Sequence, residues 1–282
     1  MFTMHLDLQI HSYHSDGERS PADIVERAMR VGLEALAITD HNVIAPETVA
    51  ATAAARRAGI RSVLGAEISC RDARRAISLH LLAYGIPEDR RDAFNDGLRA
   101  VRDGYDRRAK AIIAKLNGEV PGLALDFATM KHGEKDSMVS RNHLAMALQR
   151  FTGEEAMDIR EATRRAFVAE DDAWMPDIRE MIAFVHGMGG VAVLAHPGSR
   201  RPDAQEAAFA EYVAAGLDGF EVWSPAHDPA YTYMLQQCCA ERGLLMTAGS
   251  DWHGETLSPD KTMGMMMPAD EAMRFLQKVG AV

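Results

Sequence analysis

Histidine and acidic side chains recur along the 282-residue chain at positions where several predicted strands end. A single histidine at such a place usually packs or caps a strand, but a repeated set needs another explanation. The side chains of this set are His11, Asp16, His41, Glu67, His80, His196, Asp251 and His253. Gathering them at one place would bury several unpaired charges, and bound divalent cations would remove that cost. Imidazole and carboxylate suit zinc, manganese or iron, and a carboxylate such as Glu67 can bridge two metals.

Short apolar runs that alternate with amphipathic helical patterns must position these residues. Ser20, Pro21 and Gly32 mark the start and end of the first predicted helix, and a second covers about 46–59. The predicted strands cover residues 6–11, 33–41, 60–69, 76–86, 190–198, 217–225 and 244–254. This alternation predicts a parallel sheet, either open or closed into a barrel. In a closed barrel the carboxyl ends of all strands share one face.

The alternation of strands and helices stops between about 88 and 170, where the pattern is helical and no strand is evident. We therefore predict a barrel domain made of residues 1–87 and 171–282, with residues 88–170 as a helical insertion that caps the site. The Met-rich run 263–267 is expected to be core or flexible packing.

Basic residues near the proposed site suggest an anionic substrate. Arg200 follows the AHPGS segment, and Arg141 stands beside His143 in SRNHLAMAL. Guanidinium groups bind phosphate with two parallel hydrogen bonds, so we predict that Arg141, Arg200 and His143 contact a phosphorylated substrate. Arg108 is a third candidate arginine. Surface salt bridges are the alternative interpretation for these arginines.

Composition limits the class of protein. A net charge of −10 argues against binding duplex nucleic acid, although a small phosphate pocket remains compatible with it. The three cysteines, which include the adjacent Cys238 and Cys239, are expected to pack as reduced thiols. No signal-peptide pattern and no apolar run near the ~18 residues of a membrane span is present. We expect a cytoplasmic protein with no membrane partner, and the sequence leaves its oligomeric state open.

Seven segments together resemble the PHP (polymerase and histidinol phosphatase) superfamily of metal-dependent phosphoesterases. In chain order they are DLQIHSYHSDG, ITDHN, LGAEIS, SLHLLAYGI, LAHPGSRR, FEVWSPAH and GSDWHG. They span residues 7 to 254, and their combination is far more specific than any one of them. The SRNHLAMAL segment and the helical insertion resemble the subgroup that includes nucleoside 3′,5′-bisphosphate phosphatases.

This resemblance implies a distorted (β/α)7 TIM-like barrel with seven strands and two or three divalent metals, commonly Mn²⁺, with Fe or Zn²⁺ also possible. The family ligand positions fall on His11, Asp16, His41, Glu67, His80, His196, Asp251 and His253. One position departs from the family pattern, because Gln9 stands where the family has the first histidine of His-x-His. An amide oxygen is a weaker metal ligand than imidazole, so the site that Gln9 would share with His11, Glu67 and Asp251 is expected to be loose.

The expected activity is removal of the 3′-phosphate from a small nucleotide, a nucleoside 3′,5′-bisphosphate. The nucleophile would be a metal-activated hydroxide with no covalent enzyme intermediate. Asp251 would act at the metals, and His196 or His227 would protonate the leaving oxygen, His227 also contacting the substrate. Alternatives with the same metal centre are a cyclic phosphodiesterase, a histidinol-phosphate-type phosphatase and trimming of short RNA 5′ ends. A non-catalytic metal-binding module is the alternative of a different class, for which Gln9 is the support.

Overall fold

The computed structural model describes residues 2–130, 138–153, 157–168, 174–199 and 202–282. The strands are β1 (Thr3–Ile10), β2 (Ala35–Ile38), β3 (Arg61–Asp72), β4 (Ile77–Tyr84), β5 (Val191–Leu194), β6 (Gly219–Trp223), β7 (Leu245–Ala248) and β8 (Met265–Pro268). The helices of the barrel part are α1 (Pro21–Val31), α2 (Pro46–Arg57), α8 (Ile178–Gly187), α9 (Pro202–Glu206), α10 (Phe209–Ala214), α11 (Pro229–Arg242) and α12 (Ala269–Lys278). Between β4 and α8 lie η1 (Glu88–Arg90), α3 (Arg91–Gly97), α4 (Arg99–Glu119), α5 (Phe127–Met130), α6 (Arg141–Thr152) and α7 (Ile159–Arg165).

The strands form one sheet in the order β7-β6-β5-β4-β3-β2-β1-β8. β1, β2 and β3 run parallel to one another, as do β5, β6 and β7. β4 is antiparallel to both of its neighbours, so the prediction of a wholly parallel sheet is wrong at this strand. The reason is the short turn between Asp72 and Ile77, which allows a hairpin but not the crossover of a dozen or more residues that a parallel pair needs.

β8 is an eighth strand that the sequence analysis missed. It pairs antiparallel with β1 at the edge of the sheet, with Met4 opposite Met267. The prediction that the Met-rich run packs in the core holds for Met263 and Met267, which are buried, whereas Met266 is exposed. Composition alone marks this run as packing, whereas its pairing with β1 decides that it is a strand.

The barrel nearly closes where the chain leaves β7. The amide of Asp251 donates to the carbonyl of Gln9 at 3.0 Å, and the amide of His11 donates to the carbonyl of Trp252 at 3.0 Å. β7 lies at one edge of the sheet, and β1 lies next to β8 at the other edge. These bonds therefore join the segment after β7 to the end of β1. The TIM-like α/β barrel predicted from the sequence is confirmed, with eight strands in the sheet instead of seven.

Local signals in the sequence explain the first helix. The Ser20 hydroxyl accepts a hydrogen bond from the amide of Asp23, and the Asp23 carboxylate accepts one from the amide of Ser20, which is a capping box. Pro21 occupies the first turn, where its missing N–H costs nothing. Gly32 ends the helix with a φ of 74°, a conformation that glycine adopts without steric cost.

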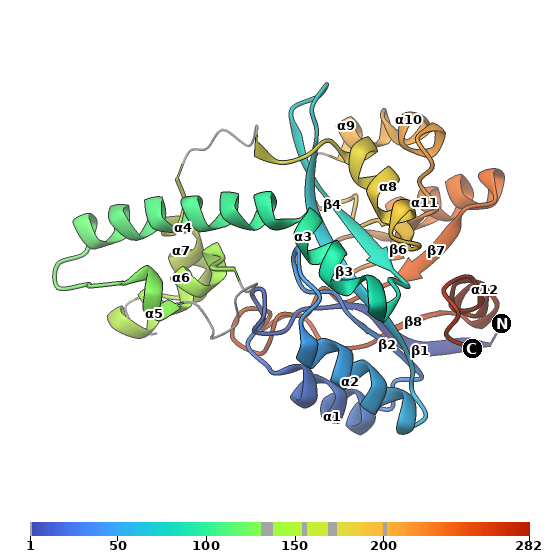
Figure 1. Cartoon of the computed structure of the whole chain (residues 1–282), viewed down its shortest axis with the longest axis horizontal. Helices are drawn as coiled ribbons and strands as arrows, with labels where there is room; N and C mark the ends of the chain where they lie inside the picture. The colour runs from blue at the N-terminus through green and yellow to red at the C-terminus, as the bar shows by residue number, and fades with distance from the viewer. Residues whose placement is uncertain (1, 131–137, 154–156, 169–173, 200–201) are drawn as a thin grey trace.

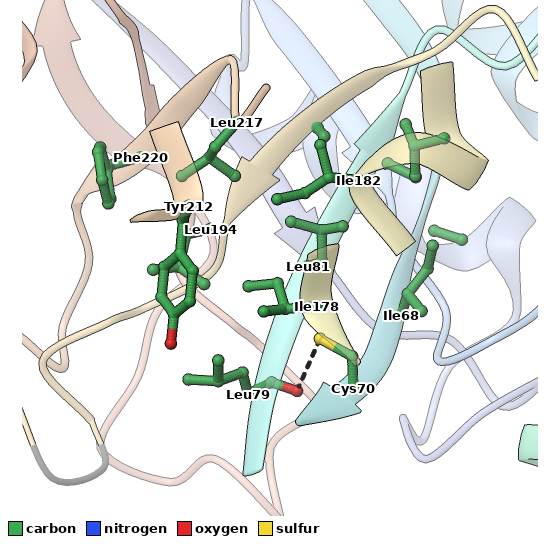
Figure 2. Packing of buried hydrophobic residues seen from close by; sticks show 14 of the residues in the cluster. Ile68, Cys70, Leu79, Leu81, Ile178, Ile182, Leu194, Tyr212, Leu217 and Phe220 are labelled. Atoms are coloured by element: carbon green, nitrogen blue, oxygen red, sulfur yellow. Dashed lines mark hydrogen bonds between the residues drawn. The ribbon is translucent and has the colours of Figure 1, made fainter. Parts of the chain in front are cut away.

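The largest core cluster lies between the β3–β4 hairpin and the helices that cover it. Figure 2 shows Ile178 and Ile182 of α8 packed against Leu81, and the thiol of Cys70 beside the carbonyl of Leu79. Cys70, Cys238 and Cys239 are free and buried, as the sequence predicts. This packing holds β3 and β4 rigid, and both strands carry site residues.

Between β4 and α8 the described residues form helices joined by loops, with no strand. In Figure 1, α4 extends far from the barrel, and α5, α6 and α7 gather along its outer part. Ile112, Leu116, Leu144 and Leu148 belong to a separate apolar cluster that holds α4 and α6 together. The division into a barrel domain and an inserted domain stays a prediction.

Candidate metal and phosphoester site

The loop after β1 brings Asp16 back towards His11. Asp40, fully buried after β2, holds this loop: its carboxylate accepts hydrogen bonds from the Ser12 amide at 2.8 Å and from the Ser15 hydroxyl at 2.7 Å. A Cβ atom at Gly17 would lie 2.1 Å from the carbonyl oxygen of His11, so the loop can close this tightly only with glycine there. Asp16 thereby reaches the neighbourhood of His41 and His253.

Glu67 lies at the centre of the polar cluster. Its Oε1 lies 2.8 Å from Nδ1 of His80 and 2.9 Å from Nε2 of His196. Its Oε2 lies 3.0 Å from Nε2 of His11 and 3.5 Å from Nδ1 of His41. One carboxylate therefore faces imidazoles that come from four different strand regions, which is the placement that a bridging ligand requires.

The direction of β4 explains how His80 reaches this cluster. His80 lies in the first half of β4, opposite Ser69 of β3. Because β4 runs against its neighbours, its amino-terminal half reaches the face formed by the carboxyl ends of the parallel strands. The prediction of His80 at the site is matched by the geometry, although the parallel direction that we assumed for its strand is wrong.

Asp16 and Asp251 complete the arrangement on the other side of His11. Asp16 Oδ1 lies 3.3 Å from Nε2 of His253, and Asp16 Oδ2 lies 3.7 Å from Nε2 of His41. Asp251 Oδ1 lies 3.3 Å from Nε2 of His11. Ligand atoms lie within 4.8 Å of one another in three overlapping groups: His11, Asp16, His41 and His253; His41, Glu67 and His80; and His11, Glu67 and Asp251.

The protonation of the acids suits cation binding. Burial raises the pKa of Asp16, but the neighbouring His253 and His41 outweigh burial and hold that pKa well below its usual range. Burial likewise raises the pKa of Glu67, and His80 and His41 reverse the shift to well below the usual value. Both carboxylates are therefore anionic at neutral pH and carry the charge that a divalent metal requires.

Buried polar atoms without a hydrogen-bond partner indicate that the cluster binds metal ions. His11 Nε2, His41 Nδ1 and Glu67 Oε2 are buried and make no hydrogen bond within the described part of the chain. Buried polar atoms are rarely left in this state, and a metal ion would satisfy all three. His196 and Asp251 also adopt positive φ angles of 26° and 53°, a strain of the kind that concentrates at functional sites.

Gln9 occupies a buried position beside this cluster. Neither heteroatom of its amide makes a hydrogen bond within the described residues. A Cβ atom at Gly249 would lie 2.5 Å from Cβ of Gln9 and 2.4 Å from Oε1 of Glu221, so the glycine lets both side chains approach. Glu221 supports the site from the other side, where its Oε2 accepts a hydrogen bond from the His196 amide at 3.0 Å.

A cavity of about 470 Å³ opens over the cluster and extends to the helices between β4 and α8. Asp16, His41, His80, His196, Asp251 and His253 line its floor. Arg108 of α4 and Arg141 of α6 also line the cavity. The guanidinium of Arg108 lies 5.1 Å from the ring centroids of both Tyr105 and Trp174, which orient it.

The other predicted substrate residues have different surroundings. His227 is held by two backbone groups: its Nε2 accepts from the Gly198 amide at 3.1 Å, so its Nδ1 donates to the Val222 carbonyl at 3.0 Å. His143 uses Nδ1 to accept from the Ser140 amide in the capping box of α6. Arg200 lies outside the described residues.

Two cavity residues escaped the sequence analysis. The amide of Asn142 donates to Asp16 Oδ2 at 2.9 Å, which ties α6 to the metal cluster. The Lys261 ammonium donates to Asp251 Oδ2 at 2.8 Å. Asn142 adjoins Arg141 within a segment already singled out, whereas nothing in the local sequence marks Lys261.

Residues 7–166 match the family described as the PHP domain. The chain belongs to the PHP-domain family. The predicted resemblance is therefore confirmed, and this PHP chain brings seven of the predicted ligand residues together in three overlapping groups.

Known proteins are similar to this one over nearly the whole chain. The PHP chain is 31% identical over 255 residues to a 3′,5′-nucleoside bisphosphate phosphatase from Chromobacterium violaceum, with 88% of this chain and 87% of the relative covered. It is 29% identical to a phosphoribosyl 1,2-cyclic phosphate 1,2-diphosphodiesterase from Eggerthella lenta, with 88% and 94% covered. A crystal structure of a protein from Bifidobacterium adolescentis, assigned as a metal-dependent phosphoesterase, superposes with a TM-score of 0.81 at 31% identity, covering 97% of this chain and 96% of that one.

The family match, these relatives and the buried ligand cluster identify the PHP chain as a metal-dependent phosphoesterase, a hydrolase. Within the described residues, no helix is both long enough and apolar enough to cross a membrane.

Proposed function

We propose that the protein is a phosphomonoesterase that removes the 3′-phosphate of nucleoside 3′,5′-bisphosphates. Water attacks the 3′-phosphorus, the bond between phosphorus and the 3′-oxygen breaks, and the products are a nucleoside 5′-phosphate and inorganic phosphate. The observation that carries this proposal is one cavity that joins the acidic ligand cluster to Arg108 and Arg141. A substrate with two phosphates would use both ends of that cavity.

We propose two or three divalent metals, Mn²⁺ first among them, with Fe or Zn²⁺ as alternatives. The residues that would hold them are the nine predicted ones: Gln9, His11, Asp16, His41, Glu67, His80, His196, Asp251 and His253. Three overlapping ligand groups support this number of sites. When bound, such metals activate water and neutralise the charge on the transferred phosphoryl group.

The chain itself supplies phosphate binding and proton transfer. Arg108 and Arg141 bind the phosphate that is not hydrolysed, because planar guanidinium groups match its oxygens. Replacing either arginine tests this assignment. The 3′-oxygen needs a proton as it leaves. Either His196 or His227 supplies it: His196 lines the cavity, with its ring nitrogens 2.9 Å from the Ser199 hydroxyl and 2.9 Å from Glu67 Oε1, whereas both ring nitrogens of His227 bond to backbone groups.

An apolar strip on the cavity wall supports a nucleoside over a simple phosphate ester. Ile112, Phe167 and Val168 line the same cavity as Arg108. The side chain of Phe167 is 53% exposed, although its backbone is held firmly by the Lys115 ammonium, which donates to the Phe167 carbonyl at 2.7 Å. An exposed aromatic ring in the lining of the cavity is a suitable surface for stacking a base.

The test is steady-state kinetics with adenosine 3′,5′-bisphosphate, 3′-AMP and 5′-AMP in the presence of Mn²⁺. We expect kcat/KM for the bisphosphate to exceed that for either monophosphate by at least about tenfold, since a charged hydrogen bond contributes ~1.5–3 kcal/mol. Equal kcat/KM values for the bisphosphate and 3′-AMP would reject the two-phosphate model and leave a general phosphoesterase.

A cyclic phosphodiesterase is the second candidate, favoured by the relative from Eggerthella lenta whose name states that activity. The same metal cluster would serve it, because both reactions add water to phosphorus. Adding a 1,2-cyclic phosphate of ribose and a short 5′-phosphorylated RNA to the substrate panel separates the candidates. The net charge of −10 supports a small nucleotide over duplex nucleic acid, and the free buried cysteines support a reducing cytoplasm.

A further inference from the structure

Lys261 places an ammonium group at the edge of the metal cluster. Its Nζ donates to Asp251 Oδ2 at 2.8 Å and to the Asp251 carbonyl at 3.1 Å. Its side chain is 30% exposed and lines the same cavity as Asp16 and His253. It comes from the connection between β7 and β8, outside every motif that identified the family.

The two oxygens of Asp251 face different groups. Oδ1 faces the imidazoles, 3.3 Å from Nε2 of His11 and 3.8 Å from Nδ1 of His253. Oδ2 faces Lys261. Asp251 can therefore use Oδ1 in the cluster and keep its bond to Lys261 through Oδ2. An ammonium group has three protons, and these two bonds use two of them, which leaves one for a ligand in the cavity.

A series of turns holds Lys261 in this place. The Ser258 hydroxyl accepts from the His253 amide at 3.2 Å, and the Ser258 amide donates to the Gly254 carbonyl at 3.0 Å. The Lys261 amide then donates to the Ser258 carbonyl at 3.0 Å. The backbone that carries the lysine is thus fixed to the segment that carries the two site residues Asp251 and His253.

We propose that Lys261 binds the phosphoryl group that is hydrolysed, through an oxygen that does not bridge to the leaving group. Arg108 and Arg141 come from the helices between β4 and α8 and are assigned to the second phosphate, which leaves Lys261 as the remaining lysine or arginine among the described residues that line the cavity. A compact ammonium at this position adds positive charge where the transition state gathers negative charge. The assignment of the two arginines rests on the proposed function, whereas the role of Lys261 is tested with a simple phosphate ester.

The test uses Lys261→Met, which removes the charge, and Lys261→Arg, which keeps it. Inorganic phosphate inhibits hydrolysis of p-nitrophenyl phosphate by occupying the same place as the substrate phosphate. We expect Lys261→Met to weaken this inhibition by about 10- to 100-fold at unchanged manganese content, and Lys261→Arg to retain most of it. Lys278→Met, on the exposed end of α12, is the matched control and should match the wild type.

Two results would overturn the proposal. One is unchanged phosphate inhibition in Lys261→Met. The other is a loss of activity that follows a loss of manganese, because Lys261 would then act only by positioning Asp251. Neither outcome depends on which nucleotide the enzyme prefers, so failure of the bisphosphate assignment and failure of this one are separate results.

A labelling experiment on the wild-type protein tests the proposal without depending on the folding of a variant. Amine acetylation followed by peptide mass mapping reports whether the Lys261 ammonium is accessible. With Mn²⁺ present, inorganic phosphate should slow labelling of Lys261 severalfold and leave Lys278 unaffected. Equal labelling of Lys261 with and without phosphate contradicts the proposal.

Discussion

Nε2 of His11 and Oε2 of Glu67 lie 3.0 Å apart, and neither side chain has any exposed surface. Despite this distance, neither atom has the geometry of a hydrogen bond within the described residues. A close contact between an imidazole nitrogen and a carboxylate oxygen, both fully buried, is the arrangement expected of two ligands of one metal ion. The other oxygen of the same carboxylate faces His80 and His196, so Glu67 can serve two metal positions.

Glu67→Gln should therefore lower metal content and activity together. If the bridging carboxylate lowers the activation barrier by ~4 kcal/mol, its removal should reduce turnover on the order of 10³-fold. Metal analysis and p-nitrophenyl phosphate kinetics on the same sample measure both quantities. Glu241→Gln, at an exposed carboxylate of α11, is the matched control. Full metal occupancy with unchanged turnover would remove Glu67 from the centre.

Gln9→His should retain metal more tightly. The amide of Gln9 is buried and unbonded within the described chain, so it is available as a ligand, but imidazole is the stronger donor. Manganese remaining after dialysis against a chelator should be higher in Gln9→His than in the wild type. Gln277→His, near the end of α12, controls for an added histidine. Equal loss from all three proteins would mean that Gln9 does not limit retention.

The preference for a bisphosphate should depend on Arg108 or Arg141. Replacing the arginine that binds the second phosphate with Gln should reduce the ratio of kcat/KM for bisphosphate over 3′-AMP by about 10- to 100-fold. Hydrolysis of p-nitrophenyl phosphate should remain intact, because that ester has no second phosphate. Arg150→Gln, on the exposed side of α6, is the control. If both cavity variants keep the wild-type ratio, neither arginine binds the second phosphate.

Phe167→Ala should weaken recognition of the nucleoside. Base stacking on an aromatic ring contributes ~1–3 kcal/mol, so KM for adenosine 3′,5′-bisphosphate should rise by about 5- to 100-fold. Phe151→Ala is a closely matched control, because its ring is 49% exposed against 53% for Phe167 but does not line the cavity. A ribose bisphosphate without a base should be insensitive to either change. Identical KM values for all three proteins would place the base elsewhere.

Stability in acid should depend on Asp72, which lies away from the site at the β3–β4 turn. Burial raises its pKa, but hydrogen bonds from Arg75, Tyr212 and Arg179 outweigh burial and lower the pKa to about 2 from an ordinary 3.8. A carboxylate with a lowered pKa stabilises the fold above its unfolded-state value and loses that contribution as the pH falls towards about 2. The shift corresponds to about 2 kcal/mol at neutral pH.

Asp72→Asn should thus unfold at lower urea concentration than the wild type at pH 7, with a difference that shrinks below about pH 4. Urea unfolding curves between pH 7 and pH 3 measure this trend. Asp92→Asn, at a carboxylate that is 82% exposed, should show no such trend. A difference that stays constant across the whole pH range would show that Asp72 acts through packing and not through its charge.

Several local features of this chain follow from its sequence alone. Ser20, Pro21 and Gly32 determine where α1 begins and ends, because capping and backbone freedom depend on residues within one turn. The eight histidine and acidic positions could also be predicted, since each follows or lies in a recognisable strand. Their resemblance to the PHP family predicts a phosphoesterase barrel. The structure confirms the barrel, and the family match and the relatives confirm the phosphoesterase.

The tertiary structure decided what depends on distant segments. β4 runs antiparallel and brings its first half, with His80, to the site, and β8 exists as a strand because β1 offers it an edge. Lys261 meets Asp251 through the fold of a connection that carries no motif. Local sequence encodes dihedral preferences over a few residues, whereas the direction of a strand and the meeting of two side chains depend on how the whole sheet closes. The sheet closes in the way that buries the most apolar surface of the entire chain, so the sequence of a short segment cannot specify that closure.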